Sequence, residues 1–257
     1  ASANQASGIG SFEPNVATLN IGGNATFSLK NYTNASYGFV VASYASTSPI
    51  TAYGNIDITS IGVSTSNYGL IYLTSALTST AGNITLTASS TNTSATLNPG
   101  VSANASGTLT ANAGAITVTS TSNASTAVSL LGAMSAKSIS ITGTSTTAST
   151  IVSLGAMTIV AGGSDLSVTA NNTSGGANTG ITQTGAITVN ASGGNISFIS
   201  NNIINQAGAI TLAANTSGTP STVLYSTTTG AKTSNIIAGA LTISSGSTSD
   251  VNYVAKT

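Results

Sequence analysis

The sequence predicts an all-β chain whose short strands stack into a repetitive solenoid. A glycine-led strand motif keeps returning along the 257 residues. Apolar and polar residues alternate within each copy, as a strand with one buried face requires. Helix-favouring residues are scarce, because only 3% of the side chains are charged, whereas β-branched residues and glycine abound.

The motif has the form Gly-x-Ile/Leu-x-Ile/Val/Leu-Thr/Ser. Full copies are GNIDIT, GNITLT, GAITVT, GAITVN, GAITLA and GALTIS, from Gly54, Gly82, Gly114, Gly185, Gly208 and Gly239, and degenerate copies start at Lys137 and Ser164. As one series, their first apolar residues are Ile56, Ile84, Ile116, Ile139, Leu166, Ile187, Ile210 and Leu241. The gaps of 28, 32, 23, 27, 21, 23 and 31 residues indicate stacked supersecondary units.

Weaker strand-like pieces lie between the main copies. They are GLIYLT from Gly69, GTLTAN from Gly107, GAMTIV from Gly155 and GNISFI from Gly194. Two or three short strands for each repeat are expected of one coil of a β-solenoid. Asn-Gly and Asp-Gly do not occur in the chain, which disfavours tight hairpins and favours strands linked by open corners.

Aromatic residues indicate a boundary near the N-terminal end. Residues 73–197 contain none, whereas nine lie before residue 73: Phe12, Phe27, Tyr32, Tyr37, Phe39, Tyr44, Tyr53, Tyr68 and Tyr72. A terminal coil exposes a strand edge that must be covered or paired. We therefore predict an aromatic-rich N-terminal cap or docking segment over residues 1–53 and a β-solenoid repeat body over residues 54–257.

Composition excludes several classes of protein. The chain has no Cys, His or Trp, and four cations balance four anions. Four scattered lysines cannot form the basic footprint of a nucleic-acid-binding protein or a polybasic membrane patch. Apolar runs are far shorter than the roughly 18 residues that a membrane-spanning helix needs. We expect neither a nucleic-acid partner nor membrane insertion.

The segments GAITVTS, GNITLTAS and GAITLAA resemble the haemagglutinin-type repeats of filamentous-haemagglutinin-like surface proteins. The resemblance covers about residues 54 to 247. It implies a right-handed parallel β-helix and an extracellular or cell-surface location. It implies neither a receptor nor a secretion route for this chain.

Catalysis and metal binding are not expected. A hydrolytic β-helix needs paired carboxylates, a basic residue or a metal in its cleft, and the carboxylates Glu13, Asp57, Asp165 and Asp250 are far apart in sequence. Without histidine a serine triad cannot form. The segment AGGSDLS around Asp165 is the nearest match to a calcium-binding β-roll repeat, but it occurs once and is interpreted as a turn. We predict no enzyme, no cofactor and no metal site.

Asparagine sequons predict possible covalent glycans. The candidate acceptors are Asn24, Asn31, Asn34, Asn92, Asn104, Asn123, Asn172, Asn190 and Asn215. Asn83 and Asn195 also form sequons but adjoin strand starts, which makes them weaker candidates.

Paired threonines suggest a face that orders water, as an ice-binding β-helix has. Thr85 with Thr87, and Thr117 with Thr119, have the local spacing of such a face. The variable repeat length argues against a regular array, so ordinary outward strand residues are the preferred interpretation.

The predicted function is structural: a subunit of an extracellular filament or cell-surface layer that assembles with copies of itself through β-strand or solenoid-end contacts. Subunit docking is predicted at Phe12, Val16, Leu19 and Ile21. An alternative fold is a pilin-like β-sandwich in which this segment is a donor strand. An alternative function is a monomeric surface adhesin or ice-binding module.

Overall fold

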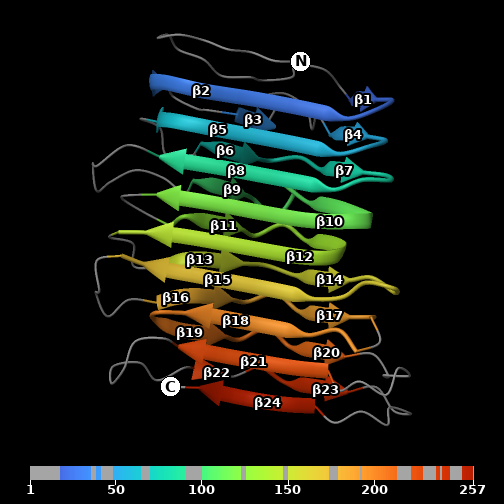
Figure 1. Cartoon of the computed structure of the whole chain (residues 1–257), viewed down its shortest axis with the longest axis vertical. Coiled ribbons are helices and arrows are strands. Elements are labelled where there is room, and N and C mark those ends of the chain that lie inside the picture. The colour runs from blue at the N-terminus through green and yellow to red at the C-terminus, as the bar shows by residue number, and fades with distance from the viewer. Residues whose placement is uncertain are drawn as a thin grey trace.

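The computed structural model describes residues 18–35, 39–41, 49–64, 70–90, 100–122, 126–146, 150–173, 179–191, 193–212, 221–227, 236–237, 239–243 and 251–256. These residues contain 24 strands and no helix. The strands pair in parallel and lie one above another along the long axis of the molecule (Figure 1). The predicted β-solenoid is therefore confirmed, and the β-sandwich alternative is wrong, because strands far apart in sequence stack in parallel.

Each rung of the solenoid passes through three columns of strands. The short-strand column comprises β1 (Leu19–Ile21), β4 (Ile50–Ala52), β7 (Leu77–Ser79), the first parts of β10 (Leu109–Ser122) and β12 (Met134–Ser145), β14 (Met157–Ile159), β17 (Ile187–Val189), β20 (Ile210–Leu212) and β23 (Leu241–Ile243). The long-strand column comprises β2 (Ala25–Ala35), β5 (Ile56–Ser64), β8 (Ile84–Ser90), the second parts of β10 and β12, β15 (Leu166–Asn172), β18 (Ile196–Ser200), β21 (Ser221–Thr227) and β24 (Val251–Lys256).

The third column forms a separate sheet that faces the other two. It comprises β3 (Phe39–Val41), β6 (Ile71–Leu73), β9 (Val101–Ala103), β11 (Val128–Leu130), β13 (Thr150–Leu154), β16 (Thr179–Gln183), β19 (Ile203–Gln206) and β22 (Ile236–Ile237). The short-strand and long-strand columns join into one sheet, because β10 and β12 each continue around the corner between them.

The structure separates the single predicted repeat series into two columns. Ile139 pairs with Leu166, and Leu166 pairs with Ile196 rather than with Ile187. Ile187 instead follows Met157 in the short-strand column. The last three copies of the motif, from Gly185, Gly208 and Gly239, thus belong to a different column from the earlier ones. The motif looks the same in both places, because each column begins after a corner and places two aliphatic side chains inward.

Repeat length varies, yet β8, the second parts of β10 and β12, and β15 pair without a register shift. Asn83 and Ala115 lie 32 residues apart and are joined by a hydrogen bond of 2.8 Å. Asn112 and Ser135 lie only 23 residues apart and are also joined directly, at 2.7 Å. The extra residues lie outside these paired segments, so equivalent residues on successive strands remain aligned.

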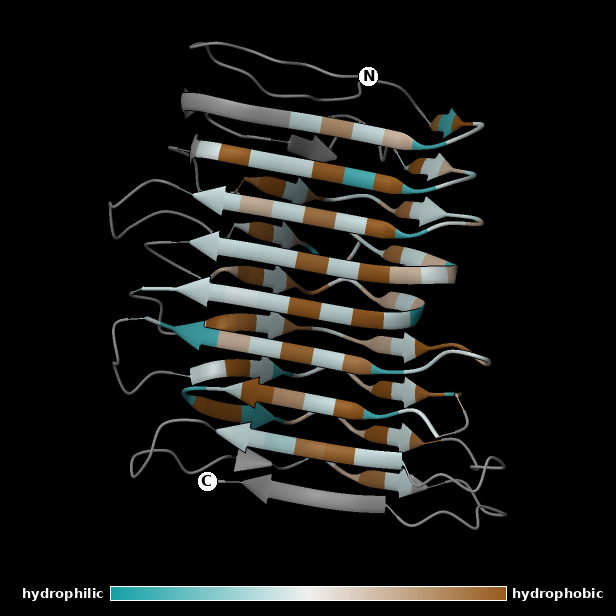
Figure 2. Cartoon of the chain, viewed as in Figure 1, coloured by the Kyte–Doolittle hydropathy of each residue, from teal (hydrophilic) through white to brown (hydrophobic). Residues whose placement is uncertain are grey.

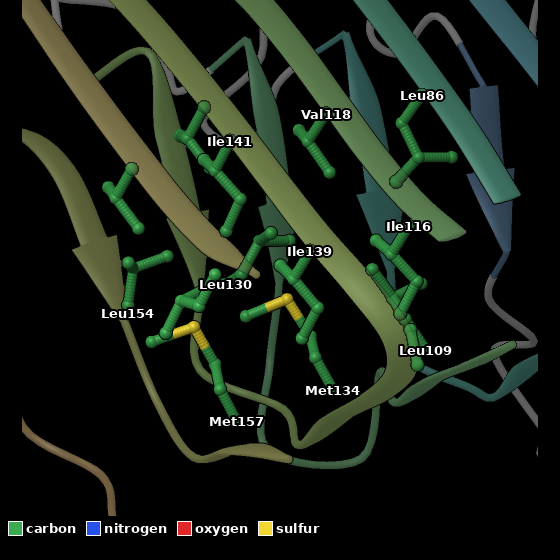
Figure 3. Close-up of a cluster of buried hydrophobic side chains, with 14 of the residues drawn as sticks. Leu86, Leu109, Ile116, Val118, Leu130, Met134, Ile139, Ile141, Leu154 and Met157 are labelled. Carbon is green, nitrogen blue, oxygen red and sulfur yellow. The ribbon is translucent and has the colours of Figure 1, made fainter. Parts of the chain in front are cut away.

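The core is a set of aliphatic stacks. Brown and pale bands alternate along the strands in Figure 2, as the pleat requires. Inward positions such as Ile56, Ile84 and Ile116 are fully buried and lie directly above one another. Figure 3 shows side chains of all three columns meeting in the interior, with Met134 and Met157 stacked in adjacent rungs. Burial of each such side chain stabilises the fold by about 1.5 to 3 kcal/mol.

Toward the end of each long strand the interior becomes narrow and accepts only small residues. One inward row holds Ser60, Ala88, Ser120, Gly143, Ala170, Ser200 and Thr227. A Cβ atom at Gly143 would lie 2.6 Å from Cγ2 of Val152 on the opposite sheet. These positions continue the alternation of inward and outward residues, and the close approach of the two sheets explains why small residues, including serine, occupy them instead of large aliphatic ones.

The stack extends into the segment predicted as an N-terminal cap. β1 pairs in register with β4, and β2 pairs with β5. Phe27, one of the aromatic residues that suggested a boundary, is 5% exposed and belongs to the common core. Strands of the solenoid therefore begin at Leu19 rather than at residue 54. Residues 1–17 lie outside the described part of the chain.

Candidate functional surfaces

The outer face of the long-strand column carries an array of hydroxyl side chains. We define the hydroxyl array as twelve residues on four consecutive strands, namely Thr85, Thr87, Ser89, Thr117, Thr119, Thr121, Ser140, Thr142, Thr144, Ser167, Thr169 and Asn171. They form three rows that run along the solenoid axis, because each residue pairs in register with its equivalent on the next strand. Eleven of the twelve bear a hydroxyl group, and none is ionisable.

The side chains of the array are available to solvent. Each is half-buried or exposed, whereas the inward residues between them are buried. None of the twelve side chains makes a hydrogen bond to another residue in the described part of the chain. The array ends where Asp57 and Ile61 replace hydroxyl residues on β5, and where Ile199 does so on β18.

A single row of polar side chains, all but one of them bearing a hydroxyl group, also follows the short-strand column. From β1 to β23 the row comprises the second residue of each strand, namely Asn20, Thr51, Thr78, Thr110, Ser135, Thr158, Thr188, Thr211 and Thr242. Each of these strands presents one outward residue between two inward ones. This surface is therefore a line of side chains, whereas the hydroxyl array extends in two directions.

An amide ladder holds the corner between the short-strand and long-strand columns. At five of the long strands, the residue just before the strand accepts a hydrogen bond, through its side-chain oxygen, from a backbone N–H one rung further on. Asn24 accepts from Asn55 at 2.9 Å, Asn55 from Asn83 at 2.9 Å, and Asn83 from Ala115 at 2.8 Å. The ladder stops at Ala115, which has no acceptor. It continues where Asp165 accepts from Asn195 at 3.0 Å and Asn195 from Thr222 at 2.9 Å.

The two carboxylates of the described part lie apart from each other. Asp57 lies on the outer face of β5, and Asp165 precedes β15. The rungs that carry them are separated by four strand spacings, or about 19 Å. Glu13 and Asp250 lie outside the described residues. The absence of catalytic activity stays a prediction.

No group of three His, Cys, Asp or Glu side chains comes together within the described residues in a way that could hold a metal ion. Asp165, in the segment that resembles a calcium-binding repeat, accepts hydrogen bonds through Oδ1 from both the backbone and the side-chain amide of Asn195, at 3.0 and 3.1 Å. Gly162, three residues earlier, has a φ of 73°, which suits a glycine turn. Asp165 therefore takes part in the corner ladder.

The sequon asparagines lie in different environments. Asn24 and Asn190 are exposed, and Asn104 is half-buried in a turn, where its Oδ1 accepts from the N–H groups of Ser106 and Gly107. Asn172 is only 4% exposed, which leaves no room for a glycan on the folded chain. Asn31 and Asn34 belong to β2, but their side chains are not described, and Asn92, Asn123 and Asn215 lie outside the described residues.

Inward side chains at the two ends of the short-strand column are more exposed than those in its middle. Leu19 and Ile21 on β1 are half-buried, whereas their partners Ile50 and Ala52 on β4 have no exposed surface. At the other end Leu241 is 42% exposed, whereas its partner Ile210 is 2% exposed. Inward residues are thus uncovered at both terminal rungs of the described stack.

Of the predicted docking residues, Leu19 and Ile21 lie on a terminal rung, and Phe12 and Val16 lie outside the described residues. β1 is paired with β4 of its own chain, so it is a rung of the solenoid rather than a free donor strand. The sequence interpretation missed Leu241 as an end residue. Its residue pattern is that of an ordinary member of the repeat, and only the pairing of β23 with β20 places it at the end of the described column.

The described residues include no helix of the length and apolar character that crossing a membrane requires. No known protein family, curated protein or solved structure matches this chain. The resemblance to haemagglutinin-type repeats therefore rests on the strand motif alone.

Proposed function

We propose that this chain is a structural element of an extracellular filament or cell-surface layer, and that copies associate end to end through the terminal rungs of the short-strand column. Each rung of a parallel solenoid offers the next one a row of backbone N–H and C=O groups and a row of aliphatic side chains. The same surface can receive a strand from a second copy, as in β-strand addition.

The exposure of Leu241 is the observation that carries the proposal. Within the column, equivalent inward residues such as Leu77 and Leu109 have no exposed surface, because a rung lies on each side of them. Leu241 has a described rung on one side only and is 42% exposed. A rung from another copy would cover it as Leu109 is covered. Removing this apolar surface from water favours association by roughly 25 cal/mol for each Å².

The terminal short strands carry no charge that would oppose such a contact. β1 has the sequence LNI and β23 has the sequence LTI. Natural sheets discourage edge-to-edge pairing with charged residues, especially lysine. The terminal long strands β2 and β24 each include one lysine, Lys30 and Lys256. We therefore assign the contact to the short-strand column.

The composition and the repeat motif support an extracellular location. The chain combines 3% charged residues with no cysteine and no histidine, so neither its charge nor its redox state responds much to an uncontrolled medium. The outer faces carry hydroxyl and amide groups instead. The strand motif resembles repeats of large surface proteins, which favours the same location.

The experiment compares two exposed leucines. Leu241→Asp places a charge at the end of the column, whereas Leu131→Asp places one at a lateral corner, where Leu131 is 51% exposed. Light scattering and negative-stain microscopy over a range of concentrations measure association. We expect the parent chain and Leu131→Asp to form elongated assemblies and Leu241→Asp to remain dispersed.

Dispersed particles of the parent chain at every concentration would contradict the proposal and favour a monomeric surface module. Equal assembly by both variants would show that the contact lies elsewhere. Circular dichroism of each variant separates a lost contact from a lost fold.

A further inference from the structure

We infer that the hydroxyl array is an ice-binding face, whose ligand is the hydrogen-bonded lattice of solid water. This activity is independent of the end-to-end association proposed above, because the array lies on the side of the solenoid and the association uses its terminal rungs. The inference rests on the regularity of the array, on its chemistry and on the free hydroxyl groups.

The array is regular although the repeats are not. A repeat length that varies between about 23 and 32 residues would argue against a periodic face if the variation reached the strands. It does not, because the rows continue from β8 to β15 without a register shift in the array. The irregular repeat length therefore does not argue against an ice-binding face.

The spacing of the array is close to that of ice. Rungs lie about 4.8 Å apart, and outward residues two positions apart on a strand lie about 6.7 Å apart. With an O–H···O distance of about 2.75 Å and tetrahedral angles, two water oxygens bonded to a common neighbour lie about 4.5 Å apart, and layers of ice repeat about every 7.3 Å. Over four rungs and three rows the accumulated mismatch is about 1 Å in each direction, which is less than half of one hydrogen-bond length.

The chemistry of the array suits a neutral, periodic and flat ligand. Hydroxyls both donate and accept hydrogen bonds, as water does, and none of the twelve residues is ionisable. Because their side chains make no hydrogen bond within the described residues, their full capacity is open to a ligand. Small-molecule sites are concave, whereas these residues project outward from a sheet. A ligand that repeats in two directions can contact all three rows at once.

The test compares the same substitution inside and outside the array. Thr119→Lys projects a long charged side chain from the middle row, where Thr119 is exposed. Thr158→Lys is the matched control, because Thr158 is an outward threonine of the short-strand column. The readouts are the thermal hysteresis of the whole chain and the incorporation of fluorescently labelled chain into a growing ice hemisphere.

We expect the parent chain and Thr158→Lys to be incorporated into ice and to depress its growth temperature, and Thr119→Lys to lose both effects. Thr87→Lys, in the same row on the neighbouring strand, repeats the test at a second position if Thr119→Lys fails to fold.

Exclusion of the parent chain from ice would overturn the inference, and so would equal losses in the array variant and the control. A parent chain that has no effect on ice, but binds crystalline chitin or cellulose and loses this binding in Thr119→Lys, would show that the ligand of the array is a polysaccharide surface rather than ice. If the parent chain has no ice activity and Thr119→Lys changes assembly, the array is a lateral contact between copies instead. The variant Leu241→Asp should keep its ice activity while losing end-to-end assembly, so the two proposals fail separately.

Discussion

The backbone N–H of Asn195 donates to Oδ1 of Asp165 at 3.0 Å, although the two residues are 30 positions apart in the chain. The side-chain amide of Asn195 donates to the same oxygen, and its own Oδ1 accepts from the N–H of Thr222. One asparagine therefore joins three successive rungs. The corners of this solenoid are held by side-chain hydrogen bonds where backbone pairing between strands is interrupted.

Removing that asparagine should loosen the corner. Asn195→Ala takes away the acceptor for Thr222 and the side-chain donor to Asp165, and it leaves the backbone N–H donor in place. We expect the free energy of unfolding to fall by about 1 to 3 kcal/mol, measured by urea denaturation. Asn190→Ala is the control, since Asn190 is exposed and its backbone N–H, which the substitution keeps, donates to the backbone oxygen of Ile159. Equal stability of the two variants would show that the corner ladder does not stabilise the fold.

The narrow part of the interior should not tolerate an added methyl group. In Gly143→Ala the new Cβ would lie 2.6 Å from Cγ2 of Val152 and 3.3 Å from Cβ of Ala127. Overpacking of this kind costs about 1 to 3 kcal/mol, and the melting temperature should fall accordingly. Gly22→Ala is the matched control, because no atom lies within 4 Å of its added Cβ. A normal melting temperature for Gly143→Ala would mean that the two sheets are further apart than described.

A buried serine in the same row should be dispensable. Oγ of Ser120 is buried and has no hydrogen-bond partner among the described residues, and its neighbours in the row are Ala88 and Gly143. Ser120→Ala removes an unsatisfied polar group, so the free energy of unfolding should be unchanged or rise by about 1 kcal/mol. Chemical denaturation measures it. A clear loss of stability would indicate that the hydroxyl has a partner, such as a buried water.

Stability should depend weakly on pH. The slope of the unfolding free energy with pH is proportional to the difference in bound protons between the unfolded and folded chain. The chain has no His, four Asp or Glu and four Lys, so few groups change their protonation between about pH 6 and about pH 9. The urea midpoint should be nearly the same at both values. A shift of the midpoint much larger than the error would contradict this expectation.

The sequence predicted the strands well and their assignment to columns less well. The alternation around Ile84, Ile116 and Ile139 marks strands that the structure contains. The series then passes to Ile187, which belongs to the neighbouring column. A short local pattern cannot distinguish two columns that both need an aliphatic pair after a corner. Only long-range pairing, such as Leu166 with Ile196, resolves them.

Surface and interior polar residues could be predicted only in part. The alternation predicts that Thr85, Thr87, Thr117 and Thr119 point outward. Their alignment into rows depends on the register between strands, which the irregular repeat lengths conceal. Ser120 is two positions after the inward Val118, so the alternation turns it inward although it is polar. The exposure of Leu241 depends on its place at the end of a column, which its own residue pattern does not encode.

The regular stacking of rungs is the claim on which the array and the end contact both depend, and pulsed dipolar spectroscopy of nitroxide pairs tests it most directly. The chain has no cysteine, so labels can be introduced at chosen sites. Thr59, Thr169 and Ser226 belong to one outward row. Pairs Thr59→Cys with Thr169→Cys and Thr59→Cys with Ser226→Cys span four and six strand spacings, so we expect distances near 19 and 29 Å. Similar distances for both pairs, or a broad distribution without a maximum, would contradict the stacked solenoid.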